Sequence, residues 1–260
     1  MGTSGSYTGG GGAAGRDLRE QISQWLESLP TSGDELPQAQ HGGVVSSPDR
    51  PPDVPRLPSE ALVSAIRLFA VGDGGGPGVG RGGRRGRRSV LASARTAGRA
   101  VAAAYALRTR DVAILTELGL DYAGLRGLDS FEQVRRIVDA ACGSTNDGTI
   151  EDDERRLVAA QVAEWVLEQE GNGAELDLEE ILRETIATII FEAAATETGH
   201  LIRNGTHPSW ASLEGERQMR ELARALADRA QLTPGAATPD DVTRAIAEGL
   251  ETLRYIRGAA

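Results

Sequence analysis

The feature that most constrains the fold is a succession of helix-period apolar patterns in the C-terminal two-thirds of the chain. Apolar residues recur at three- and four-residue spacing, and no stretch of useful length alternates apolar and polar residues as a strand does. Aromatic residues make up only 4% of the 260 residues, which suits helices packed through small side chains. We therefore predict an all-α fold, an irregular bundle of about six to seven helices. The patterns cover 89–107, 111–118, 130–142, 149–170, 177–203, 213–231 and 238–256.

Three of these segments open with helix-start signals. Ser130 is a suitable N-cap for 130–142. Thr149 with Asp152 three residues later resembles a capping box. Thr238 before Pro239, followed by two aspartates, combines an N-cap, a proline in the first turn and favourable charge.

The same periodicity predicts which faces are buried. The 177–203 segment has the most apolar positions and is expected to be the most buried helix. The residues expected on buried faces are Phe131, Val134, Ile137, Val138, Ala141, Leu157, Val158, Val162, Trp165, Val166, Ile181, Leu182, Ile186, Ile189, Ile190, Phe191, Met219, Leu222 and Leu226.

Glycine, proline and serine dominate the first 83 residues. Residues 1–15 cannot bury enough apolar surface to offset the entropy of ordering them, so we predict a flexible tail. Residues 16–83 hold two short helical patterns, at 16–29 and 59–71, beside Pro- and Gly-rich linker sequence. The predicted organisation is thus a disordered Gly/Pro-rich N-terminal region, with a tail at 1–15 and short helices and linker at 16–83, followed by a helical domain at 84–260.

Composition and charge limit the classes of function. The formal net charge of −10 argues against general affinity for nucleic acid. No run approaches about 18 consecutive apolar residues, and the N-terminus lacks the regions of a secretory signal. We therefore expect a cytoplasmic protein that does not enter a membrane. Because Cys142 is the single cysteine, the chain has no internal disulfide and no cysteine-rich metal site.

The chain contains no lysine, so all 28 basic residues are arginine. Arginine stays protonated and is a poor nucleophile at neutral pH. The α-amino group, with a reference pKa of about 7.7–8.0, is then the only ordinary amine. Any conjugation that forms an amide with this protein is expected at its first residue.

Seven arginines lie close together at the start of the helical domain. One interpretation is a phosphate-binding arm for nucleic acid, in which Arg84, Arg85, Arg87 and Arg88 are the central contacts. The other is a solvated junction that neutralises the acidic body, and no aromatic residues are interleaved for stacking on bases. The cluster consists of Arg81, Arg84, Arg85, Arg87, Arg88, Arg95 and Arg99.

Other chemical signatures are incomplete. Residues 143–154 partly imitate a calcium-binding EF-hand loop, but Gly143 stands at position 1, where such a loop needs a carboxylate, and Thr145 stands at position 3. His41, His200 and His207 have no metal-ligand spacing, and no nucleophile elbow, Walker motif or dinucleotide fingerprint is present. Residues 1–6 formally fit the N-myristoylation pattern, a short motif that often occurs by chance. We predict that the protein is not an enzyme and binds no metal.

The opening residues Met1-Gly2-Thr3-Ser4-Gly5-Ser6-Tyr7, followed by a glycine- and proline-rich stretch, resemble the MGTSxSYGG start of the QatB family. QatB proteins are subunits of the four-component Qat anti-phage defence systems of bacteria. The segment from Arg81 to about Arg257 is also similar to that family, with its Arg/Gly-rich start, its Ala-rich helix and its helix-loop-helix around 137–151. Thr8 stands where the family often has glycine, and residues 15–58 have no counterpart.

The resemblance implies a role as an acceptor protein. Qat systems also contain an ATPase, a TatD-like nuclease and a partner similar to the 7-cyano-7-deazaguanine synthase QueC. The QueC-like partner joins a 7-deazaguanine group, through an amide, to an N-terminal glycine of its protein partner. In this chain the acceptor is Gly2, which has no side chain to obstruct a narrow pocket. The recognition residues are Thr3, Ser4, Gly5, Ser6 and Tyr7, and no other cofactor is implied.

Overall fold

The computed structural model describes residues 12–29, 54–70, 88–143, 149–169, 177–204, 209–233 and 235–258. Those ranges contain ten helices and a single two-residue parallel ladder, in which β1 (Phe69–Ala70) pairs with β2 (Arg88–Ser89). The prediction of an all-α fold is confirmed. The helices are α1 (Gly12–Glu27), α2 (Ser59–Ile66), α3 (Val90–Thr109), α4 (Val112–Glu117), α5 (Tyr122–Arg126), α6 (Ser130–Cys142), α7 (Ile150–Glu168), α8 (Leu178–Asn204), α9 (Ser209–Ala227) and α10 (Pro239–Gly258).

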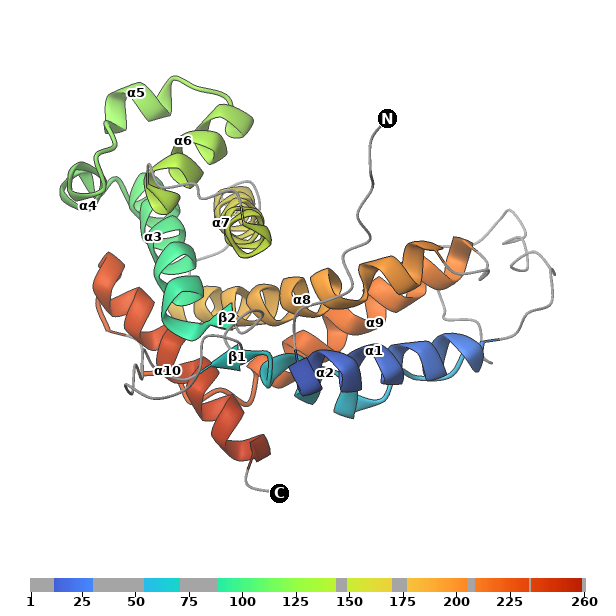
Figure 1. Ribbon diagram of the computed structural model, residues 1–260. Coiled ribbons are helices and arrows are strands. Elements are labelled where there is room, and N and C mark those ends of the chain that lie inside the picture. Colours follow the sequence, from blue (N-terminus) through green and yellow to red (C-terminus); the bar gives the residue numbers. More distant parts are fainter. Residues whose placement is uncertain are drawn as a thin grey trace, which may run out of the picture.

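Two long helices organise the packing (Figure 1). Helix α3 is contacted by α4, α6, α7 and α10, and helix α8 is contacted by α1, α2, α7, α9 and α10. In Figure 1, α8, α9 and α1 lie side by side, whereas α4, α5 and α6 gather at the other end of the molecule around α3. Because α7 and α10 each contact both long helices, the buried residues form one continuous core.

Small side chains let α3 approach its neighbours closely. Seven of its alanines are at most 1% exposed, which permits close contact on several sides of the helix. At Gly98, a Cβ atom would lie 2.6 Å from the Thr243 hydroxyl and 2.9 Å from the Thr243 Cα, both on α10. A glycine is therefore required at this crossing of α3 and α10.

The predicted burial of the longest helix is confirmed. The named apolar residues of α8, from Ile181 to Phe191, are all buried. Two other predictions of burial are wrong: Phe131 is 78% exposed and Leu157 is also exposed. Helix α6 is anchored instead by Ile137 and Ala141 in its second half, so its first turn extends beyond the core.

Two of the predicted helix starts are confirmed and one is wrong by one residue. Thr149 and Asp152 form a reciprocal capping box at the start of α7. The Thr238 hydroxyl accepts from the Asp241 backbone N–H at the start of α10. At α6 the cap is Asp129 and not Ser130, because the Asp129 carboxylate accepts from the N–H of Glu132.

The structure also shifts the predicted boundaries. Helix α1 begins at Gly12, inside the segment predicted as a tail at 1–15, and α1 and α2 share the core with the helices of 84–260. The folded body therefore starts well before Arg84. Residues 84–260 contain eight described helices rather than six or seven, since α5, at Tyr122–Arg126, is too short to produce a periodic pattern.

We predict that Gly98→Ala destabilises the protein. Alanine favours a helix interior over glycine by about 1 kcal/mol, but overpacking against the α10 backbone costs about 1–3 kcal/mol. The melting temperature should therefore fall. The matched control is Gly127→Ala, where a Cβ would meet its nearest neighbour at 3.9 Å and φ is −83°. An equal or higher melting temperature for Gly98→Ala would contradict the close crossing.

Candidate functional site

Most residues predicted to carry function lie outside the described part of the chain. Gly2 and the recognition residues Thr3, Ser4, Gly5, Ser6 and Tyr7 are among them, as are Arg84, Arg85 and Arg87. Arg88 forms part of β2. What the structure provides is the body to which the N-terminal segment is joined, beginning at the first turn of α1.

The first half of α1 is attached to α8 through a buried ion pair. Arg19 donates from its guanidinium to Oε2 of Glu197 at 2.8 Å. The Glu197 side chain is only 1% exposed and that of Arg19 is 18% exposed. One turn earlier, a Cβ on Gly15 would lie 3.1 Å from the same oxygen, so the glycine lets α1 approach the carboxylate. The junction between the N-terminal segment and the body thus has a defined place on α8.

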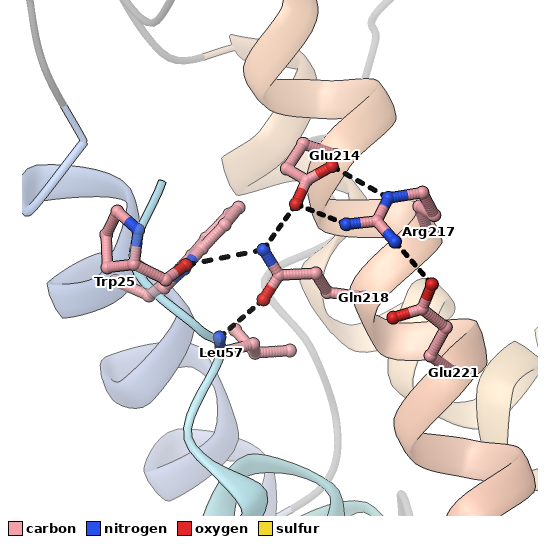
Figure 2. Close-up of polar contacts among 7 residues, drawn as sticks. Trp25, Leu57, Glu214, Arg217, Gln218 and Glu221 are labelled. Carbon is pink, nitrogen blue, oxygen red and sulfur yellow. Dashed lines mark hydrogen bonds and ion pairs between the residues drawn. The ribbon is translucent and has the colours of Figure 1, made fainter. Parts of the chain in front are cut away.

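The other end of α1 is attached through Trp25. Its indole N–H donates to the Pro55 carbonyl at 3.0 Å, and its ring packs on α9 where Gly215 has no side chain. Gln218 on α9 donates to the same carbonyl at 3.3 Å and accepts the Leu57 N–H at 2.5 Å (Figure 2). We call residues 54–58, which precede α2, the strap. The strap, α1 and α9 therefore meet at one hydrogen-bonded cluster.

Two arginines of α3 are engaged inside the body. Arg99 donates to the Ala140 carbonyl and Arg108 to the Val166 carbonyl, each at 3.0 Å. Both carbonyls lie in the last turns of their helices, where backbone oxygens lack partners and arginine is favoured. Arg99, one of the seven clustered arginines, thus has a structural partner, whereas Arg95 is exposed.

The ionisable groups with perturbed pKa values are scattered. Burial raises the pKa of Glu192, against the opposing effect of a 2.7 Å hydrogen bond from Gln161. Burial also raises the pKa of the Cys142 thiol, which makes it a weaker nucleophile. Hydrogen bonds from Arg135 and Arg136 lower the pKa of Glu132 to about 2. None of these groups pairs with a second one as a nucleophile and base would.

The described surface has two hollows, and the first is lined by groups that already bind one another. One, of about 450 Å³, lies between α7, α8 and α9 and includes Trp165, Arg183, Glu184 and Arg224. Arg224 forms a paired ion contact with Glu184, and Arg183 donates to carbonyls at the end of α9. The other hollow, of about 460 Å³, lies between α3 and α10.

In the described ranges, no three His, Cys, Asp or Glu side chains are grouped as metal ligands. His200 lies on α8, while His41 and His207 fall outside those ranges, as do residues 144–148 of the loop that imitates an EF-hand. Among the described helices none is both long enough and apolar enough to cross a membrane.

Comparisons with protein-family models, with curated proteins and with solved structures find no match to this chain. The functional argument therefore depends on the residues themselves.

Two groups of the body were not predicted to matter. Glu197 is one more acid in an apolar helix, and Gln218 is an ordinary polar residue of an amphipathic one. Their partners lie 178 and 161 residues away in the chain. The helical pattern at 16–29, which includes Trp25, was the single local signal for these contacts in the sequence.

We predict that Arg19→Met weakens the protein, because it removes a guanidinium from a carboxylate that stays buried. Breaking such a pair costs about 3 kcal/mol, which should appear in the urea unfolding midpoint. Arg135→Met is the matched control, since its ion pair with Glu132 is solvent-exposed and contributes little. Equal midpoints for the two variants would argue against an anchoring role for Arg19.

We predict a pH-dependent effect of Glu192→Gln. Because burial raises the folded-state pKa of Glu192, the native protein holds this proton more tightly than the unfolded chain. The stability that protonated Glu192 contributes to the folded state is therefore fully present below its ordinary pKa of 4.5. This stability is lost as the pH rises through the raised pKa of the folded state. The variant should be at least as stable as wild type at pH 7.

The gain from Glu192→Gln should shrink as the pH falls towards 4.5, as measured by urea unfolding at both pH values. Glu164→Gln, at an exposed position on α7, is the control and should show no such trend. If the stability gain from Glu192→Gln instead grew as the pH fell, the prediction would be contradicted.

Proposed function

We propose that this protein is a non-catalytic component of an anti-phage defence system, and that the α-amine of Gly2 accepts a 7-deazaguanine group from a QueC-like partner. The observation that carries the proposal is the absence of lysine from a chain with 28 basic residues. The resemblance of residues 1–7 to the QatB start supplies the identity of the group and the partner.

The chemistry follows from the properties of an α-amine. Once Met1 is removed, Gly2 carries a primary amine with a reference pKa of about 7.7–8.0, so a fraction is neutral at physiological pH. The neutral nitrogen attacks an activated acyl carbon of the deazaguanine donor. An amide bond forms, the activating group departs, and the nitrogen loses its proton. Guanidinium groups do not compete, because they remain protonated.

The helical body has a separate role in the proposal, which is to dock partner subunits. Once Met1 is removed, the ten residues before α1 can span at most about 36 Å when fully extended. The partner's catalytic pocket must then lie within that distance of the first turn of α1, where Gly15 lies beside Glu197. The ATPase and the TatD-like nuclease are further candidate partners for the body.

The test is co-expression with the QueC-like enzyme, followed by intact-mass measurement and peptide mapping. We expect one adduct, and we expect it on the peptide that begins at Gly2. Gly2→Leu should abolish the adduct because a bulky residue obstructs the pocket and hinders removal of Met1. Gly2→Ala is the control, since its small side chain still permits that removal.

A partner-free measurement checks the premise separately. An amine-reactive ester at neutral pH should label the purified protein once, at its N-terminus. An unmodified protein after co-expression, or an adduct at another residue, would overturn the proposal even if this labelling succeeds.

A further inference from the structure

Arg220 on α9 lies over an aromatic ring although a buried carboxylate follows that ring in the sequence. Its guanidinium carbon is 4.1 Å from the centroid of the Phe191 ring, and Phe191 is only 4% exposed. Two other arginines of α9, Arg217 and Arg224, form ion pairs with carboxylates. Among the ion pairs of the described residues, none includes Arg220. Its positive charge is therefore placed on a ring instead of on an anion.

The carboxylate is that of Glu192 on α8, which is 5% exposed. Gln161 on α7 donates to its Oε1 at 2.7 Å. The charged groups that act on it from the neighbouring helices are Glu154 on α7, which is itself 8% exposed, and Arg220 and Glu216 on α9. An ionised carboxylate at such depth is costly unless a cation pairs with it, and the hydrogen bond from a neutral amide does not supply that charge.

The surroundings keep Glu192 protonated to a higher pH than an exposed glutamate. Burial is the largest effect on the pKa of Glu192 and raises it. The hydrogen bond from Gln161 and the charge of Arg220 lower that pKa, and the charges of the two neighbouring glutamates raise it. A protonated carboxyl group has no net charge to attract a guanidinium, so Arg220 gains more from the ring of Phe191.

Ionisation of Glu192 reverses this preference. The attraction between a guanidinium and a ring is modest, whereas a charge-assisted hydrogen bond to a partly buried carboxylate is stronger. Helix α9 packs along α8 (Figure 1), and Arg220 already contacts the residue that precedes Glu192. Rotations about its side-chain bonds can therefore carry the guanidinium from the ring to the carboxylate without a shift of either helix.

We propose that Arg220 is a proton-dependent switch with two positions. While Glu192 is protonated, the guanidinium lies over Phe191. When Glu192 is ionised, the guanidinium moves to the carboxylate and uncovers one face of the ring. The α8–α9 surface then presents an aromatic face that is covered at lower pH.

The experiment measures double-mutant cycles on the full chain by urea unfolding, at pH 4.5 and at about pH 9, the upper end of the range that burial gives to carboxylates. One cycle combines Arg220→Ala with Phe191→Leu, and the other combines Arg220→Ala with Glu192→Gln. We expect the first coupling to be about threefold in the unfolding equilibrium constant at pH 4.5 and to vanish at the higher pH. The second should be absent at pH 4.5 and about tenfold at the higher pH.

Two further variants test the assignment of the carboxylate. Glu216 lies one turn before Arg220 on the same helix, so a cycle of Arg220→Ala with Glu216→Gln is the control and should give little coupling. Glu154→Gln removes a charge that raises the pKa of Glu192, so the exchange should move to lower pH. A purely structural Arg220 would not respond to Glu154→Gln. A larger coupling to Glu216 than to Glu192 at about pH 9 would overturn the proposal.

A direct readout does not require the Phe191 variant to fold. The chain has three phenylalanines, so labelling with fluorinated phenylalanine gives one resonance for each, and Phe69→Leu and Phe131→Leu leave the third assigned to Phe191. The isotope shift of this resonance between H2O and D2O measures contact of the ring with water. It should increase from pH 4.5 to about pH 9 in the wild type and be large at both pH values in Arg220→Ala. An unchanged shift in the wild type would contradict the switch.

Discussion

The burial of α8 on nearly every side is the constraint on which the rest of the structure depends. Helix α8 contacts α7, α9, α10, α1 and α2, and its apolar residues from Ile181 to Phe191 are all buried, so these five helices share one central element. Residues before 30 and after 239 are both required to cover it. This explains why the N-terminal helix belongs to the folded body although glycine- and proline-rich sequence separates it from the other helices.

Because the chain has no lysine, arginine supplies the positive side-chain charge of the folded body. Arginine supplies each of the described ion pairs, from the buried contact of Arg19 with Glu197 to the exposed contacts along α6 and α9. Its planar fork also reaches backbone carbonyls at helix ends, as Arg99 and Arg108 do. The positive charges that stabilise the fold and the amine available for conjugation are therefore different groups. The body is held by groups that cannot be acylated at neutral pH, and the proposed conjugation is left to the N-terminus.

The sequence by itself determined the helical character and most helix positions, because periodic apolar residues and local caps such as Thr149 with Asp152 act over three or four residues. The sequence also determined that the α-amine is the single ordinary amine of a chain without lysine, on which the proposed conjugation depends. Only the tertiary structure decided that Gly15 and Arg19 meet Glu197, that Gly98 meets Thr243, and that Gln218 is hydrogen-bonded to Pro55 and Leu57. Those contacts join residues more than 100 positions apart, and no local pattern encodes them. They arise when separate apolar faces close on one core and bring polar side chains into a low-dielectric space where each must find a partner.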